Sequence, residues 1–253
     1  MIRARTWGIV CAALVSAGNA LATPTAQQKC DEARVTARKV YETCVDAVVA
    51  KDAKGVSVDE YKAFWKCRHA YFKKWTSFQS KVSLAGSTCV GARHADNGST
   101  ITDNLTGLEW EKKTDDGSIH DKDNIYSWST GTPYKGDGAA FATFLTGAGT
   151  GLNVVGFAGA NDWRLPTLAE LQTILMDFPC TGTGGGSGCI CPGACIAPSF
   201  ASFDPNTQID FYWTSTGSLP SPNLGWYVYF YFGFVTNNPK TSSYFVRAVR
   251  GGL

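Results

Sequence analysis

The histidines are the first residues to examine for catalysis, because they carry out acid–base and metal chemistry near neutral pH. His69, His94 and His120 lie far apart in the sequence, so none of them stands in a metal-spaced pair. The chain also lacks the Gly-x-Ser-x-Gly elbow that presents a serine nucleophile. These two observations favour a protein that is not an enzyme.

Acidic and amide side chains gather in a few turn-rich places. The groups are Asp96, Asn97, Asp103 and Asn104; Asp115-Asp116; and Asp121, Asp123 and Asn124. Paired carboxylates can act as acid and base, and about six to eight oxygens suit calcium. The same residue types also form ordinary Asx turns and solvated loops. We therefore expect turns and no cofactor, with a calcium site as the alternative.

Eight of the nine cysteines lie beyond the first 22 residues, in two sets of four. The sets are Cys30, Cys44, Cys67 and Cys89, and Cys180, Cys189, Cys191 and Cys195. An even number of cysteines in an exported chain predicts disulfides. Zinc is the alternative for the second set, although the Cys-x-Cys spacing is unusual for zinc. A Cys189–Cys191 bond would be strained, so we expect Cys180 to pair with one of these two and Cys195 with the other.

Residues 1–22 have the pattern of a secretory signal. Arg3 and Arg5 precede an apolar stretch at 8–18, and Ala20-Leu21-Ala22 fits a cleavage site. We find no other apolar run long enough to span a bilayer. The sequence thus predicts a secreted, periplasmic or cell-surface protein without a membrane span.

The charge differs between two parts of the chain. Residues 23–89 contain 12 basic and 7 acidic residues, whereas residues 90–253 contain 9 basic and 14 acidic residues. Together they are near neutral, which argues against nucleic acid as a partner. We expect the two parts to attract one another, with docking of the basic part on an anionic surface as the alternative.

Residues 23–89 predict a helical hairpin. Apolar residues recur at helical spacing across 26–50, Gly55 breaks the pattern, and Ser57 with Glu60 forms a capping box. A second apolar stripe follows, made of Tyr61, Phe64, Cys67, Tyr71, Trp75 and Phe78. Because so short a link makes the helices antiparallel, we predict the bridges Cys44–Cys67 and Cys30–Cys89.

Residues 90–253 predict short strands and short helices. We expect strands at 100–102, 108–111, 211–218, 225–237 and 244–252, a helix within 138–149, and a hairpin tip at 237–240. The segment NDWRLPTLAEL at 161–171 joins an extended stretch to a second helix, with Thr167 and Glu170 as its capping box. Leu168, Leu171 and Leu175 give this helix one apolar face.

Five segments in order resemble the Lcl C-terminal domain family over about residues 94–252. They are TITDNLTGLEWEKK, GANDWRLPTLAELQTIL, YWTSTGS, GWYVYFYFG and YFVRAVRGG. The resemblance implies an α+β fold like the C-type lectins and formylglycine-generating enzymes, with a small twisted antiparallel sheet and long loops. It implies that Trp163 and Leu165 anchor the core, and that Arg164 pairs with an acidic group or with carbonyls. The expected parts are thus a signal peptide (1–22), a hairpin (23–89) and an Lcl C-terminal-like domain (90–253).

Some members of this family attach to sulfated polysaccharides or surface glycans, which implies a binding or adhesion module. The residues we predict for ligand binding are Tyr227, Tyr229, Tyr231, Arg247 and Arg250, because tyrosine rings stack on sugars. The formylglycine-generating relatives use a reactive thiol pair, whereas the cysteines here are assigned to structural bridges. The alternative function is a disulfide-stapled connector that binds a protein partner through the basic hairpin.

Overall fold

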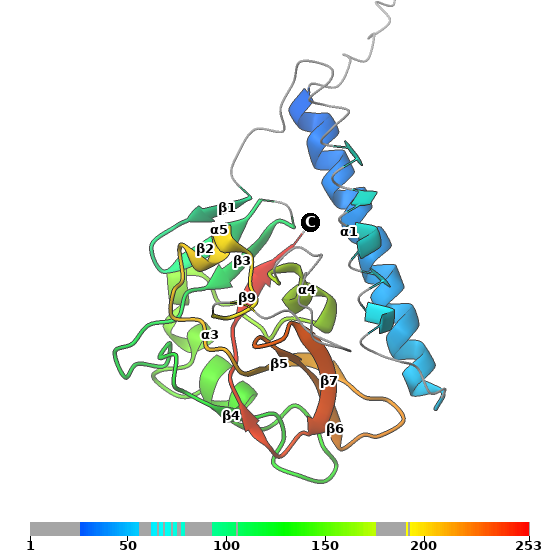
Figure 1. Cartoon of the computed structure of the whole chain (residues 1–253). Helices are drawn as coiled ribbons and strands as arrows, with labels where there is room; N and C mark the ends of the chain where they lie inside the picture. Colours follow the sequence, from blue (N-terminus) through cyan, green and yellow to red (C-terminus); the bar gives the residue numbers. More distant parts are fainter. Residues whose placement is uncertain are drawn as a thin grey trace, which may run out of the picture.

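The computed structural model describes residues 26–55, individual residues between 62 and 78, residues 93–175 except 105, residue 191, and residues 193–252 (Figure 1). The predicted signal segment 1–22 lies outside these residues, as do the capping box of Ser57 and Glu60 and the bridge partners Cys89, Cys180 and Cys189. Among the described residues, none of the helices is both long and apolar enough to cross a bilayer.

The predicted hairpin is present in the described part of the chain. Helix α1 (Ala26–Ala53) ends at a turn in which Gly55 has a positive φ of 66°, a conformation that glycine adopts at no steric cost. The described residues of the 62–78 segment are helical as well. The predicted Cys44–Cys67 disulfide is confirmed, and the rings of Tyr41 and Tyr71 lie 5.4 Å apart. These two contacts make the segment antiparallel to α1.

The described residues from 93 to 252 build three antiparallel sheets, which confirms the predicted mixture of helix and antiparallel sheet. The first contains β1 (His94–Asp96), β2 (Thr100–Asp103), β3 (Leu108–Glu111) and β9 (Val249–Gly251) in that order. The second pairs β4 (Tyr126–Ser127) with β8 (Ser243–Tyr244). The third contains β5 (Phe211–Gly217), β6 (Leu224–Tyr229) and β7 (Phe234–Pro239).

Short helices connect these sheets. They are η1 (Ala140–Leu145, a π-helix), α3 (Leu152–Val155), η2 (Phe157–Gly159, a 3₁₀-helix), α4 (Leu168–Thr173) and α5 (Pro198–Ala201). Helix η1 confirms the helix expected within 138–149. This helix follows Gly138. The Gly138 amide donates to the Trp128 carbonyl at 3.1 Å, so the backbone around Trp128 lies where a side chain at position 138 would have to be.

The junction before α4 forms as the sequence predicts. The Thr167 hydroxyl accepts from the Glu170 amide at 3.2 Å, and the Glu170 carboxylate accepts from the Thr167 amide at 2.8 Å. Both guanidinium nitrogens of Arg164 also donate to Glu170, at 2.7 and 2.8 Å. Trp163 and Leu165 are buried. One carboxylate thus caps the helix and fixes the preceding arginine.

The single strand predicted at 225–237 is wrong, because the chain reverses inside it. Strands β6 and β7 pair along their full length, and the Gly233 amide donates to the Tyr229 carbonyl at 2.8 Å. Gly233 has a φ of +67°, which permits the reversal. The predicted tip at 237–240 is also wrong, since Asn237 and Asn238 pair with Trp226 and Gly225 within the sheet.

The terminal run 244–252 is divided between two sheets instead of forming one strand of a final hairpin. Tyr244 pairs with Tyr126 in the small sheet, whereas Val249 pairs with Trp110 in the four-stranded sheet. Between them, Val246, Arg247 and Ala248 are all buried. The chain therefore passes through the core as it crosses from one sheet to the other.

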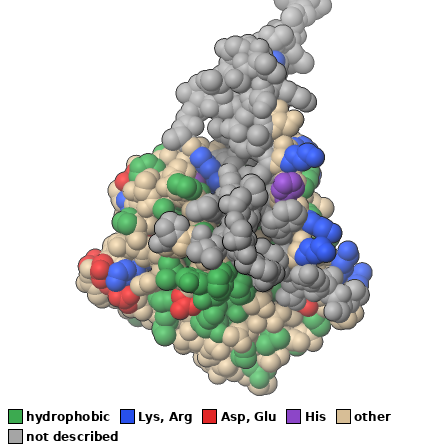
Figure 2. All heavy atoms as spheres, viewed as in Figure 1, with side chains coloured by type: hydrophobic (Ala, Val, Ile, Leu, Met, Phe, Trp, Pro, Cys, Tyr) green, Lys and Arg blue, Asp and Glu red, His purple; other side chains and the backbone are tan. Residues whose placement is uncertain are grey.

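Charge is unevenly spread over the surface. In the view of Figure 2, most Lys and Arg side chains lie along the side on which α1 runs, together with a histidine. A compact group of acidic side chains, with basic atoms among them, lies at the opposite edge. In this view, basic side chains therefore gather near the hairpin, and the acidic group lies at the other edge.

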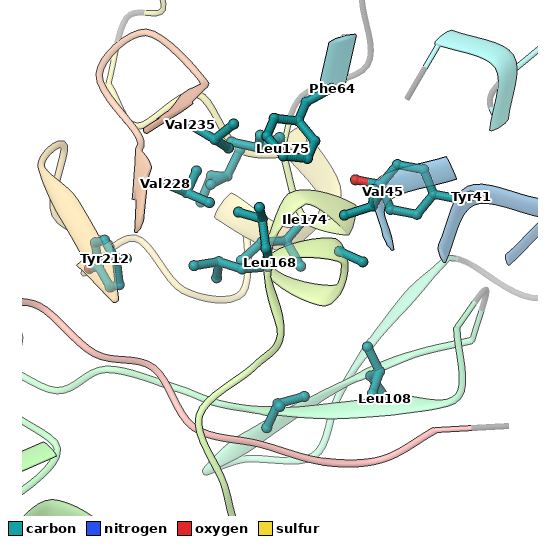
Figure 3. Close-up of a cluster of buried hydrophobic side chains, with 14 of the residues drawn as sticks. Tyr41, Val45, Phe64, Leu108, Leu168, Ile174, Leu175, Tyr212, Val228 and Val235 are labelled. Carbon is teal, nitrogen blue, oxygen red and sulfur yellow. The ribbon is translucent and has the colours of Figure 1, made fainter. Parts of the chain in front are cut away.

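The hairpin and the sheets share one hydrophobic cluster. Figure 3 shows Phe64 beside Leu175 and Val235, while Val45 faces Ile174 from the other side. The rings of Phe64 and Trp226 meet edge to face at 5.5 Å. The apolar face of the hairpin therefore packs against the inner face of the β5–β6–β7 sheet and the α4 region. A separate cluster around Trp163, Phe144 and Trp213 fills the other end of the domain.

Candidate ligand-binding site

The face of the β5–β6–β7 sheet opposite the hairpin carries a continuous aromatic strip, one end of which packs against the cluster around Trp163, Phe144 and Trp213. We define this strip as Phe211, Tyr227, Tyr229, Tyr231, Phe232, Phe234 and Tyr244. Strand register places Phe211, Tyr229 and Phe234 side by side across the three strands. Side chains alternate along a strand, so Tyr212, Val228 and Val235 point to the opposite face, where they are buried.

Ring contacts join the strip from end to end. The Phe211 ring lies 5.1 Å from Tyr244, 4.8 Å from Tyr227 and 4.4 Å from Tyr229. The Tyr229 ring lies 5.2 Å from Phe234 and 5.9 Å from Tyr231. These separations lie in or just below the range of favourable aromatic pairs, about 4.5–7 Å between ring centroids. The rings therefore support one another as a surface rather than surround a cavity.

Exposure differs along the strip. Tyr231 is 41 % exposed, whereas Tyr227 is only 6 % exposed. Phe211, Tyr229, Phe232, Phe234 and Tyr244 have intermediate exposure. Tyr229 and Tyr231 can therefore contact a ligand directly, while Tyr227 supports the rings above it. The phenylalanines were not predicted, because only the strand pairing and the turn bring them beside the tyrosines.

A carboxylate stands next to the strip. Asp210 immediately precedes Phe211 and accepts a hydrogen bond from its amide at 2.8 Å, and the Asp210 carbonyl accepts from the Phe230 amide at 3.1 Å. Burial, with smaller contributions from Tyr244 and Asp210, raises the pKa of Tyr227 to about 12. Burial and then Asp210 also raise the pKa of Tyr229. Asp210 therefore adds a negative charge beside the strip, and burial is the main reason that Tyr227 and Tyr229 keep their protons.

The strip lies inside a region that comparison with known proteins identifies. A family model described as the Lcl C-terminal domain matches residues 99–250, which is more than half of the chain. The chain belongs to the Lcl C-terminal domain family. No curated protein and no solved structure matches it. The match covers β2 to β9, so the whole aromatic strip belongs to the Lcl domain, and the hairpin precedes it.

Arg247 of the Lcl domain has no exposed surface with which to contact a ligand. Its guanidinium pairs with Asp204 and donates to the Glu111 carbonyl at 2.6 Å and to the Thr207 hydroxyl at 2.7 Å. Burial would lower the pKa of Arg247, but Asp204, Tyr212 and Glu111 together raise it on balance. We therefore remove Arg247 from the candidate site.

Arg250 lies on a different sheet from the strip. It extends from β9 and donates to Asp162 at 2.8 Å and to Glu109 at 2.7 Å. These carboxylates satisfy its charge on the four-stranded sheet. The predicted combination of tyrosines with Arg250 is therefore not assembled in the described structure.

The acidic groups of the Lcl domain are organised as turns. Carboxylate oxygens of Asp115, Asp121 and Asp123 come within 4.8 Å of one another. However, the Lys122 ammonium pairs with Asp115 at 3.1 Å and with Asp123 at 2.9 Å. Asp121 accepts from the amides of Asp123, Asp116 and Gly117 at 2.9, 2.8 and 2.6 Å. A lysine thus already provides positive charge to the cluster.

The other oxygen-rich group is split by burial. Asp96 pairs with Lys112 at 2.9 Å near the surface, whereas Asp103 is buried and lies 3.4 Å from Arg93. The two carboxylates therefore serve different ion pairs and do not form one ligand set.

A buried polar network ties the end of the chain to β3. The Glu111 carboxylate accepts from the Ala248 amide at 2.9 Å and pairs with Lys113 at 3.1 Å and with His120 at 2.8 Å. Burial would raise the pKa of Glu111, but Lys113 and His120 lower it on balance. This network stabilises a negative charge inside the fold, and nothing in the local sequence pattern predicted it.

The Cys191–Cys195 disulfide lies beneath the turn that presents the strip. It agrees with the prediction that Cys195 bonds to one of the two preceding cysteines. The Cys195 amide donates to the Phe230 carbonyl at 2.7 Å, and Cys195 is buried. The disulfide therefore supports the backbone from which Tyr231 and Phe232 project.

Proposed function

We propose that this protein is an exported, non-catalytic binding or adhesion module that recognises glycans through the aromatic strip. The observation that carries the proposal is the row of rings that runs from the second hydrophobic cluster, at Tyr227, to the exposed Tyr231 on the sheet face opposite the hairpin. In this proposal the matched domain has a C-type-lectin-like fold, with the strip on its three-stranded sheet.

Glycan recognition suits the chemistry of the strip. A tyrosine ring offers an apolar face and a polar edge, which match the apolar face and the hydroxyl rim of a sugar. Contiguous exposed aromatic surface is unfavourable in water unless it serves an interaction. The rings are held by neighbours and by paired strands, so little conformational freedom is lost when a ligand binds.

Disulfides support the proposed location outside the cytoplasm. Cys44–Cys67 and Cys191–Cys195 are both formed, and disulfides persist in oxidising compartments. The signal pattern at residues 1–22 agrees with this location. We accordingly propose secretion to the periplasm, the medium or the cell surface.

The proposal also treats the acidic and histidine groups as structural. His120 and Lys113 are hydrogen bonded to the buried Glu111, and Lys122 pairs with two carboxylates of the acidic turn. We assign these paired groups a structural role. Neither catalysis nor a cofactor is therefore part of the proposal.

A glycan array probed with the chain lacking residues 1–22 tests this function. We expect binding to a restricted set of glycans, and we expect Tyr229→Ala and Tyr231→Ala each to weaken it about tenfold, the effect of losing one stacked ring. The control is Leu219→Ala, which removes an apolar side chain that is 72 % exposed and outside the strip. Absence of glycan binding, or equal binding by all three variants, would show that the strip is not a sugar site.

A connector role is the second candidate, and the hairpin provides a specific observation for it. Lys62, Lys66, His69 and Lys73 are exposed at intervals of three and four residues, so they share one helical face. Phe64, Cys67 and Tyr71 of the same segment are buried. This basic face suits an acidic protein surface.

The connector role is tested with the whole chain, because the hairpin shares its core with the sheets. We expect a variant with Lys62→Glu, Lys66→Glu and Lys73→Glu to lose salt-sensitive protein partners in a pull-down while keeping glycan binding. The opposite result, retained partners, would contradict the connector role.

A further inference from the structure

We propose that the aromatic strip selects glycans that carry free, protonated amino groups over neutral or sulfated glycans. This inference rests on the proposed glycan-binding function and adds the chemical class of the ligand. It follows from a negative charge, that of Asp210, which the described structure places beside the rings.

Asp210 is that charge, and its position is fixed by the sheet. Its backbone carbonyl and its carboxylate are both hydrogen bonded, to the amides of Phe230 and Phe211. These residues flank Tyr229 in the paired strands. Asp210 is itself exposed. A ligand lying on Tyr229 and Phe211 therefore passes next to an accessible carboxylate.

The described basic side chains of the sheet region are engaged elsewhere. Arg247 is enclosed in the core beside Asp204, and Arg250 pairs with Asp162 and Glu109. The Lys240 ammonium lies over the Trp128 ring at 4.1 Å from its centroid and donates to the Tyr134 carbonyl at 3.2 Å. None of these three cations faces the strip to pair with a sulfate, so they do not offset the repulsion between Asp210 and a sulfated glycan.

An ammonium group on a sugar would satisfy both features of the surface. Aromatic faces attract cations, and the carboxylate attracts the same charge. A β-linked glucosamine chain also presents flat apolar sugar faces for stacking. An N-acetylated chain retains the stacking surface and loses the charge, which makes it the matched neutral ligand.

The test is calorimetric titration of the chain lacking residues 1–22 at a pH that keeps sugar amines protonated. The probes are a β-1,4-linked glucosamine hexamer, its fully N-acetylated counterpart, a heparin hexasaccharide and a lysine hexapeptide. We expect the glucosamine hexamer to bind about tenfold more tightly than the N-acetylated one, as one cation–ring and carboxylate contact would give, with no measurable binding of heparin.

Variants distinguish charge from stacking. Asp210→Asn should abolish the preference for the amine while leaving the N-acetylated hexamer bound, and Tyr229→Ala should weaken both hexamers. Asp46→Asn on α1, which removes the same charge from an exposed position away from the strip, should change neither.

The outcomes separate this inference from the function on which it rests. Equal binding of the two hexamers, tighter binding of heparin, or an amine preference unchanged in Asp210→Asn would overturn the inference and leave glycan binding standing. Equally tight binding of the lysine peptide would show that the strip recognises positive charge on a basic peptide and does not select an amino sugar. Failure of every sugar to bind, supported by an empty glycan array, would overturn both.

Discussion

Arg247 and Asp204 form an ion pair in which neither side chain reaches solvent. Asp204 also accepts from the Lys113 amide at 3.0 Å, so its loss would leave a buried cation and a buried donor unsatisfied. We expect Asp204→Asn to lower the free energy of unfolding by about 3–5 kcal/mol, the usual effect of breaking a buried pair. Urea denaturation measures this loss of stability.

The control Asp96→Asn breaks the surface pair with Lys112 and should cost about 1 kcal/mol or less. Similar losses in the two variants would contradict the structural role of Arg247.

His94 predicts a dependence of stability on pH. It is fully buried, its Nδ1 lies 2.7 Å from the Ser199 hydroxyl, and burial lowers its pKa from 6.5 to about 4. The unfolded chain therefore binds a proton at a higher pH than the folded chain does. The free energy of unfolding should consequently fall as the pH drops from about 6.5 to about 4, by about 3 kcal/mol in total.

Denaturation curves at several pH values, read with His94→Gln, check this dependence. The variant should lose the slope between pH 6.5 and 4, although its overall stability will also change. The lowered pKa values of Glu111 and Glu170 act at lower pH, because their contribution is lost only below their ordinary pKa of 4.5. An unchanged slope in His94→Gln would show that another group carries the effect.

The two disulfides should differ in their contribution to stability. Cys44–Cys67 spans 23 residues and Cys191–Cys195 spans 4. The chain-entropy estimate gives roughly 3 kcal/mol for the longer loop and roughly 2 kcal/mol for the shorter one. Double alanine variants of each pair, compared by their denaturation midpoints, measure the difference. A larger loss for the Cys191–Cys195 variant would mean that this disulfide acts mainly in the folded state.

Gly138 should tolerate no larger residue. A Cβ there would lie 2.5 Å from the Ser129 backbone nitrogen and closer still to the Ser127 carbonyl oxygen. The backbone would have to move, so we expect Gly138→Ala to lower the free energy of unfolding by about 3 kcal/mol. Gly193→Ala is the matched control, since its Cβ would meet nothing within 4 Å. Thermal unfolding of the two variants tests this prediction, and equal melting temperatures would contradict the predicted clash at Gly138.

Local sequence signals predicted the local structure well. The capping box of Thr167 and Glu170 depends on residues three positions apart, and it forms as expected. The Cys44–Cys67 bridge followed from two helices joined by a short link. In each case the relevant interaction is decided by a short stretch of chain or by simple geometry, so the sequence alone contains the information.

Local sequence patterns did not predict the interactions between segments that are distant in the sequence. Hydrophobic residues continue without a break from Trp226 to Phe232, and this pattern conceals the turn that ends β6. Tyr244 and Phe211 meet at 5.1 Å only because β5, β6 and β8 are brought together. Arg247 looked like a surface residue of a terminal strand, but it crosses the core between two sheets. The sequence therefore predicted the tyrosines of the candidate site but not its phenylalanines or the carboxylate of Asp210.

The packing of Phe64 against Trp226 has a mechanical consequence. The same three strands receive the hairpin on one side and carry the aromatic strip on the other. A force transmitted along α1 would therefore act directly on the sheet that carries the aromatic strip, through the packed side chains. If the protein acts in adhesion as proposed, tension on α1 under flow would deform the aromatic strip.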